Sequence, residues 1–216
     1  MNPTESDHIH RFVPGEAGAD APTLLLLHGT GGDENSLLEL GRALYPGAAR
    51  LSPRGQILEH GMPRFFRRLA EGVFDEEDLI RRTNALVGFV GEAATRYGFD
   101  PARVVAVGYS NGANIAASTL LLHPGTLSGA VLLRPMVPLR LATLPDLAGT
   151  QVLLASGRHD GMVPVANVEL LAERFRQAGA TVTHQWSEAG HPLTSSEVAA
   201  AGEWLRDCFP AVRAGR

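Results

Sequence analysis

Hydrophobic residues along this chain follow two patterns, and the two patterns alternate. Short, nearly continuous apolar runs are typical of strands in a parallel sheet that is covered on both faces. Longer stretches with apolar residues three or four positions apart are typical of amphipathic helices. We expect strands at residues 24–27, 49–52, 104–107, 129–133, 151–155 and 181–186. We expect helices at residues 36–45, 78–97, 113–123, 165–178 and 194–209.

This alternation predicts the α/β class, with a mostly parallel central sheet and helices on both of its faces. Alternating polarity over residues 8–13 adds a half-exposed strand at the edge of the sheet. Asp75, three residues before Asp78, is placed to cap the long second helix. At 216 residues the chain suffices for one well-buried core. We therefore expect a single domain over residues 1–216, with a polar N-terminal segment at 1–21.

Composition excludes several classes of partner. The net charge is −4, and the 19 basic residues, all arginines, form no basic stripe that would suggest nucleic acid. No apolar run approaches the roughly 20 residues that span a bilayer. Residues 1–21 lack the charged and apolar regions of a signal peptide. The single cysteine, Cys208, cannot form an internal disulfide, so we expect a cytoplasmic protein.

The strongest chemical signal is the pentapeptide Gly108-Tyr109-Ser110-Asn111-Gly112, which lies between a predicted strand and a predicted helix. This is the G-x-S-x-G pattern in a strand–turn–helix context, where a sharp turn lifts the serine above the sheet. Small residues on either side let strand and helix approach closely. The helix also points its N-terminal amides at the serine, which favours an anion there. Ser110 is the candidate nucleophile.

Asp160 and His191 are the candidate partners of this serine. A serine hydroxyl needs a base to remove its proton and a third group to orient that base. In α/β-hydrolases these groups follow in the order Ser, Asp or Glu, His, each just past a strand. Asp160 and His191 stand past the strands at 151–155 and 181–186, in that order. Asp146 and Glu188 are weaker candidates for the acidic group, because Asp146 lies in a proline-rich loop and Glu188 is too near His191.

The loop after the strand at 24–27 is a candidate oxyanion hole. In this fold two backbone amides hold the oxyanion, one after the nucleophile and one after an early strand. The matching amides are those of Asn111 and Thr30. A dinucleotide-binding interpretation of Gly29 and Gly31 is disfavoured, because Glu34 stands where the last glycine is needed.

We expect neither a metal nor another cofactor. His8 and His10 could point one way from a strand, but no third ligand has matching spacing. His28 is expected to brace the loop that follows it. His159 adjoins Asp160 and cannot readily bridge its neighbour and Ser110, so His191 is preferred as the base.

Residues 60–68 form a connection that is longer than a minimal link between a strand and a helix. Its composition is mixed, with large apolar side chains beside three arginines. Long loops at the carboxyl edge of such sheets tend to build substrate pockets. We expect Met62, Phe65 and Phe66 to form one wall of the pocket and Met136 to stand on the opposite wall. The alternative is a surface loop pinned by two core phenylalanines.

Six segments carry a resemblance to a known family. They are LLLLHGTGG (residues 24–32), GMPRFFRRL (61–69), EGVFDEEDL (71–79), GYSNGANIAAS (108–118), PMVP (135–138) and AGHPLT (189–194). Together they resemble the small carboxylesterase/phospholipase branch of the α/β-hydrolases, especially the bacterial MhqD-like carboxylesterases, and more distantly the acyl-protein thioesterases. The resemblance implies an α/β-hydrolase fold with no cap domain, the roles given above for Ser110, Asp160, His191, Thr30 and Asn111, and a possible homodimer.

The function predicted on this basis is a cofactor-independent serine hydrolase that cleaves small to medium carboxylic esters. Three alternatives stay open, and one of them, non-hydrolytic chemistry on quinols or aromatic rings, is suggested only by the association of the resembled family with quinone stress. The same machinery could hydrolyse thioesters or lysophospholipids if the loop with Met62 and Phe66 borders a long apolar tunnel. Alternatively, the chain could be a ligand-binding protein on a hydrolase scaffold.

Overall fold

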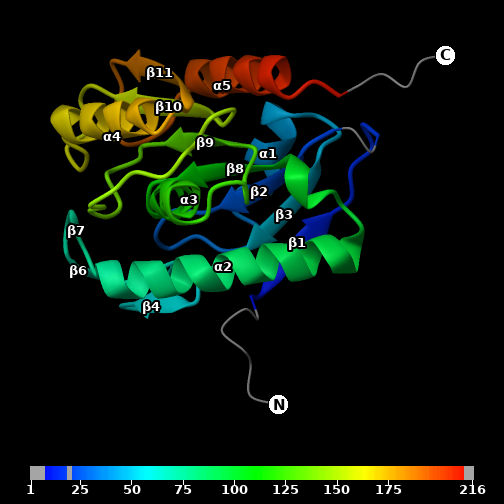
Figure 1. Cartoon of the computed structure of the whole chain (residues 1–216), viewed down its shortest axis with the longest axis horizontal. Helices are drawn as coiled ribbons and strands as arrows, with labels where there is room; N and C mark the ends of the chain where they lie inside the picture. The colour runs from blue at the N-terminus through cyan, green and yellow to red at the C-terminus, as the bar shows by residue number, and fades with distance from the viewer. Residues whose placement is uncertain (1–7, 19–20, 212–216) are drawn as a thin grey trace.

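A seven-stranded sheet runs through the computed structural model, which describes residues 8–18 and 21–211 (Figure 1). The strand order is β1-β3-β2-β8-β9-β10-β11; β1 is antiparallel to β3, and every other neighbouring pair is parallel. The strands are β1 (His10–Val13), β2 (Thr23–Leu27), β3 (Ala49–Pro53), β8 (Val104–Tyr109), β9 (Gly129–Leu133), β10 (Gln151–Gly157) and β11 (Thr181–Ser187). The expected edge strand is therefore confirmed as β1.

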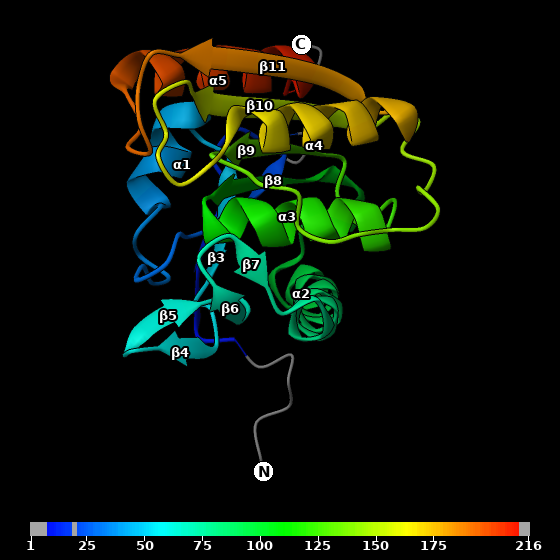
Figure 2. The same cartoon turned by 90° about the vertical axis from the view of Figure 1, so that its left-hand side faces the viewer.

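Helices cover both faces of this sheet. Figure 2 shows α2, α3 and α4 side by side over one face, while α1 and α5 lie over the other. The helices are α1 (Leu38–Leu44), α2 (Glu76–Tyr97), α3 (Asn111–Leu122), α4 (Val165–Gln177) and α5 (Ser195–Cys208), with a 3₁₀ turn η1 at Pro101–Arg103. No helix in the described ranges is long and apolar enough to cross a membrane.

The continuous apolar runs are explained by the two hydrophobic cores. In β2, Leu25 and Leu27 pack into the core under α2, α3 and α4, whereas Leu24 and Leu26 pack under α1 and α5. Successive side chains of a strand point to opposite faces, so a strand between two layers of helices needs apolar residues at every position.

Local capping explains where two helices begin. The Asp75 side chain accepts a hydrogen bond from the amide of Asp78, as the spacing had predicted. Thr194 and Glu197 form a reciprocal capping box at the start of α5. Helix α1 begins two residues later than expected. There the Asp33 carboxylate accepts hydrogen bonds from the Asn35 amide and the Ser36 hydroxyl, and this holds a turn instead of a helix.

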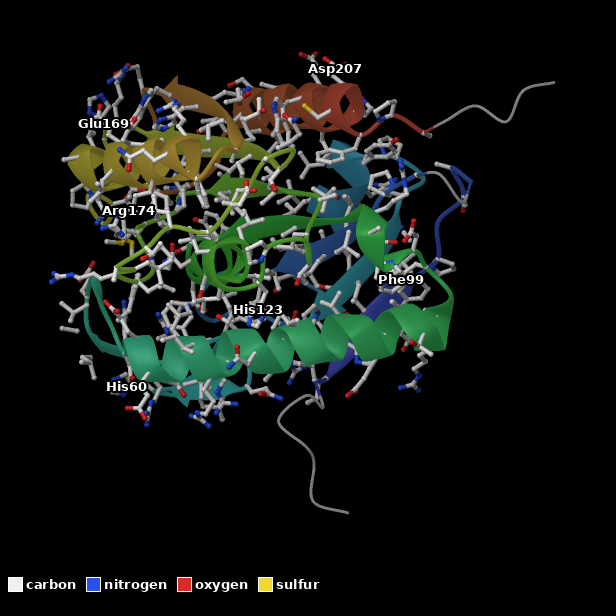
Figure 3. All side chains as sticks on the ribbon, in the orientation of Figure 1. His60, Phe99, His123, Glu169, Arg174 and Asp207 are labelled. Atoms are coloured by element: carbon white, nitrogen blue, oxygen red, sulfur yellow. The ribbon has the colours of Figure 1, made fainter. Side chains whose placement is uncertain are left out.

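Two short hairpins separate β3 from α2, where the sequence had indicated only a loop. They are β4 (Ile57–Glu59) with β5 (Met62–Arg64), and β6 (Arg68–Ala70) with β7 (Val73–Phe74). Figure 1 shows β6 and β7 at the N-terminal end of α2. His60 and Gly61, both with positive φ, make the two-residue turn of the first hairpin, and His60 lies on the outside of the molecule (Figure 3). In the described ranges, these hairpins occupy the connection and no separate cap domain is present.

Candidate active site

Ser110 lies at the junction of β8 and α3, near the middle of the sheet. Its backbone has φ 53° and ψ −113°, a conformation that costs energy for any residue other than glycine. Its amide donates a hydrogen bond to the Leu133 carbonyl at 2.8 Å. A Cβ atom on Gly112 would overlap the Leu27 carbonyl, and one on Gly108 would overlap α3. Both glycines are therefore required for the close approach that holds the strained serine.

The structure brings Ser110, His191 and Asp160 into one hydrogen-bonded chain. His191 Nε2 lies 3.0 Å from Ser110 Oγ, and His191 Nδ1 lies 2.8 Å from Asp160 Oδ2. Ser110 follows β8, Asp160 follows β10 and His191 follows β11, so the carboxyl ends of three strands of one sheet contribute the three groups. Chain separations of 81 and 31 residues are closed by the parallel sheet.

The buried Asp160 carboxylate sets the orientation of His191. Its side chain is 1% exposed, and Oδ1 accepts hydrogen bonds from the amides of Met162 and Val163 at 2.9 and 3.2 Å. Oδ2 is left facing His191 and accepts the proton on Nδ1. Nε2 then carries a lone pair that can accept the Ser110 hydroxyl proton. This is the tautomer that a general base requires.

Arg134 is a buried support of the His191 loop that the sequence interpretation missed. It follows β9 with φ 58°, and its side chain is 0% exposed. Nε donates to the carbonyls of Gly190 and His191 at 2.9 and 3.1 Å, and Nη2 donates to the Pro192 carbonyl at 3.0 Å. Nε also lies 3.9 Å from Asp160 Oδ2. One guanidinium therefore fixes the backbone around His191.

Glu197 is the ion-pair partner of Arg134. Its two oxygens accept hydrogen bonds from Arg134 Nη1 and Nη2 at 2.7 and 3.0 Å. Burial raises the pKa of Glu197, but hydrogen bonds from Arg134, the Thr194 amide and the Ser187 and Thr194 hydroxyls outweigh this and lower the pKa to about 2. Glu197 is therefore ionised at neutral pH and both caps α5 and pairs with Arg134.

His28 braces the loop that carries Thr30, as the sequence had suggested. The ring is buried; Nδ1 donates to the Gly29 carbonyl at 2.7 Å, and Nε2 accepts from the Gly55 amide at 2.9 Å. Burial lowers the pKa of His28, which keeps the imidazole neutral as this pair of bonds requires. The Gly31 amide also donates to the Pro63 carbonyl at 2.9 Å, so β5 holds the loop from its other side.

Side chains of α3 fix two loops beside Ser110. Asn111 Oδ1 accepts a hydrogen bond from the Phe65 amide at 2.8 Å, and Asn114 Oδ1 accepts one from the Met136 amide at 2.7 Å. The two asparagines stand three residues apart, so they lie on the same side of the helix. This Asn-x-x-Asn spacing is the signal that could have revealed Asn114.

A small cavity, partly open to solvent, lies over Ser110 and His191. Thr30, Asn111 and Met136 line it, as expected from the sequence. Arg134, on the same expected wall as Met136, lines it too. Further lining residues that the sequence interpretation did not assign are Arg64, Arg68, Glu71, Gly72, Phe74, Asn114, Met162 and Val163. The cavity wall is therefore more polar than the expected pair of apolar walls.

The expectation for Phe65 and Phe66 is wrong, because neither side chain lines this cavity. They are 2% and 0% exposed and belong to the core under α2, α3 and α4. Burying a large apolar side chain stabilises the fold by about 1.5–3 kcal/mol. Met62 is also absent from the cavity wall; it is exposed and lies over Gly31 at the outer edge of the loop. The alternative of a loop pinned by two core phenylalanines is the one observed.

The mostly parallel sheet with helices on both faces, and the strained serine between a central strand and its helix, define the α/β-hydrolase fold. The chain belongs to the phospholipase/carboxylesterase family, whose pattern matches residues 9–209. The resemblance drawn from the sequence motifs is thereby confirmed.

Relatives in this family are similar over nearly the whole chain. MhqD of Bacillus subtilis, assigned as a hydrolase, is 50% identical over 194 residues, which cover 90% of this chain and 97% of MhqD. The crystal structure of a Bacillus cereus carboxylesterase is 52% identical, with a TM-score of 0.90 over 93% of this chain and 94% of that one. YahD, whose structure was solved with malic acid, is 32% identical in sequence; its TM-score is 0.88, and the match covers 94% of this chain and 100% of YahD.

Proposed function

We propose that this protein is a serine hydrolase that cleaves small to medium carboxylic esters through an acyl-enzyme formed on Ser110. The observation that carries the proposal is the hydrogen-bonded chain from Ser110 through His191 to Asp160, which faces the cavity. Membership of a carboxylesterase family agrees with this chemistry.

In the proposed mechanism, Ser110 Oγ attacks the ester carbonyl while its proton passes to His191 Nε2. Asp160 stabilises the imidazolium that forms. The tetrahedral intermediate then breaks its bond to the alcohol, and His191 returns the proton to that leaving oxygen. Water, activated by His191, attacks the acyl-enzyme by the same route and releases the acid. The reaction needs no metal or cofactor.

Negative charge develops on the former carbonyl oxygen, and we assign its stabilisation to the amides of Thr30 and Asn111. The Asn111 amide begins α3, where the helix dipole also favours an anion. Bracing of the Thr30 loop by His28 and Pro63 supports this role, because a preformed donor needs no reorganisation during the reaction. Loss of one such donor typically costs about 3 kcal/mol of barrier.

Cavity size and wall chemistry favour short acyl groups over long ones. The thioesterase or lysophospholipase alternative called for a long apolar tunnel along residues 62–66, but Phe65 and Phe66 fill the core instead. YahD, a solved relative, was described with malic acid, a small dicarboxylic acid, so small polar compounds are the class to test first. Initial rates across p-nitrophenyl esters from acetate to palmitate should peak at short chains; a peak at palmitate would favour the alternative.

The decisive variant is Ser110→Ala. We expect normal folding and a loss of p-nitrophenyl acetate hydrolysis of about 10⁴-fold or more, because removal of a nucleophile disables the whole triad. Ser196→Ala, an exposed serine on α5, is the matched control and should keep full activity. A fluorophosphonate probe should label the wild-type protein and Ser196→Ala, but not Ser110→Ala. Failure to label the wild type would support the ligand-binding alternative.

Cellular location and oligomeric state stay predictions from the sequence. Cell fractionation tests the cytoplasmic location, and sedimentation velocity tests the homodimer.

A further inference from the structure

Two arginines form one wall of the cavity that contains Ser110. Arg64 ends β5 and is buried, and Arg68 begins β6 with its side chain 25% exposed. Neither belongs to the proposed triad or oxyanion hole. Burying a charged group is costly unless charge or hydrogen bonds compensate it. Two guanidinium groups in a small cavity therefore need an explanation.

One carboxylate is shared by both arginines. Glu59 Oε1 accepts a hydrogen bond from Arg68 Nε at 2.8 Å, and Glu59 Oε2 lies 3.2 Å from Arg64 Nε. The hydrogen bond from Arg68 lowers the pKa of Glu59, which is therefore ionised at neutral pH. In the described ranges no other carboxylate lies within ion-pair distance of either arginine. The group of three thus keeps one uncompensated positive charge.

Part of the donor capacity of these arginines is already used. Arg64 Nη1 donates to Thr30 Oγ1 at 2.6 Å, and Arg64 Nε donates to the Phe66 carbonyl at 3.2 Å. Contacts of Arg68 within the described residues involve only Nε, so its two terminal amino groups have donors to offer at the cavity wall. A planar guanidinium with such donors matches a carboxylate, which can accept two parallel hydrogen bonds.

We propose that Arg68, supported by Arg64, forms a subsite for an anionic group, and that the preferred substrates are short esters that carry a carboxylate a few bonds from the ester carbonyl. This inference rests on the proposed ester hydrolysis and names its substrate class. Glu71, the acidic residue among those that line the cavity, is exposed at the rim, where solvent screens its charge. The carboxylate of the substrate would take the place of solvent beside Arg68.

The test compares two esters of equal chain length. Monomethyl glutarate carries one carboxylate at neutral pH, whereas dimethyl glutarate is its neutral diester. Initial rates in a pH-stat give kcat/KM for each. In the wild type we expect the monoester to be favoured about tenfold or more, the effect of one charged hydrogen-bond pair. Added salt should reduce this ratio.

Arg68→Met should lower the monoester-to-diester ratio of kcat/KM about tenfold, and Arg68→Lys, which keeps the charge, should retain part of the preference. Arg67→Met is the matched control. Arg67 is the adjacent arginine, pairs with Asp75 and does not line the cavity, so the wild-type ratio should persist. Circular dichroism verifies the fold of each variant.

The outcomes separate this inference from the proposed function. Hydrolysis of both esters with a ratio near one, or an unchanged ratio in Arg68→Met, overturns the carboxylate subsite and leaves ester hydrolysis standing. Labelling of Ser110 by a fluorophosphonate without turnover of the monoester also overturns the subsite. If Ser110 is not labelled and neither ester is hydrolysed, the proposed function itself fails.

Discussion

Two groups of arginine and glutamate flank the candidate active site, and they differ in how completely their charges are satisfied. Behind His191, the Arg134 side chain is buried; it pairs with Glu197 and also donates to four backbone carbonyls. Across the cavity, Arg64 and Arg68 share the single carboxylate of Glu59. The first group has one positive charge for each negative charge, and the second has an excess of one.

The comparison separates a structural role from a recognition role. A buried charge with every partner supplied by the protein holds its surroundings in one geometry and has nothing to offer a ligand. A charge on a cavity wall with donors left over can gain stabilisation from a bound anion. We therefore expect changes at Arg134 to affect folding first, and changes at Arg68 to affect substrate preference first.

The largest effect is expected from Arg134→Met. This variant leaves the Glu197 carboxylate buried without its cation and should lower the free energy of unfolding by about 3–5 kcal/mol. Urea denaturation measures the loss. Arg68→Met is the contrast; it changes a partly exposed ion pair, and we expect about 1 kcal/mol or less.

The double variant Arg134→Met/Glu197→Gln separates loss of charge balance from loss of packing. It leaves no unpaired buried charge and should recover part of the stability lost in Arg134→Met. A single variant as stable as the wild type would contradict the structural role of this pair.

Acid should weaken the Arg134–Glu197 pair over a defined pH range. The folded-state pKa of Glu197 is about 2, below its ordinary value of 4.5. A depressed pKa contributes stability above the unfolded-state value, and this contribution is lost as pH falls toward the folded-state value. The difference corresponds to about 3 kcal/mol. Between pH 4.5 and about 2, the free energy of unfolding should therefore fall more steeply in the wild type than in Glu197→Gln. Parallel curves would rule out this linkage.

The smallest effect is expected at the rim of the cavity. Glu71→Gln removes an exposed negative charge near the proposed anion subsite and should raise the preference for monomethyl glutarate about two- to threefold at low salt. Glu169→Gln makes the same change on the outer surface of α4, away from the cavity (Figure 3), and serves as control. An equal response of both variants would assign the effect to net charge alone.

Sequence patterns predicted the proposed triad because each of its members carries a local signal. Ser110 stands in a pentapeptide whose glycines are required by close packing, and Asp160 and His191 each follow an apolar strand. In a parallel sheet, the carboxyl ends of strands meet at one edge, so order along the chain is enough to bring these residues together.

No comparable local signal predicted the ion pair between Arg134 and Glu197. The two residues lie 63 positions apart, and arginine and glutamate are ordinary surface residue types. The capping role of Glu197 could be inferred from Thr194 three residues earlier, but its ion pair could not. The pair forms because the connection after β9 and the start of α5 meet beneath the His191 loop. Only their arrangement in space reveals it.

The sequence by itself determined the fold class, the order of the helices and of the strands in the large sheet, and the three residues of the proposed triad, because periodicity and turn chemistry are properties of neighbouring residues. Only the tertiary structure decided what the connection at 60–68 presents to the cavity. Phe65 and Phe66 turned into the core because burial stabilises large apolar groups, and Arg64 was left with Arg68 on the wall. Which side of a mixed segment faces a ligand depends on packing against distant elements, and no local pattern encodes that.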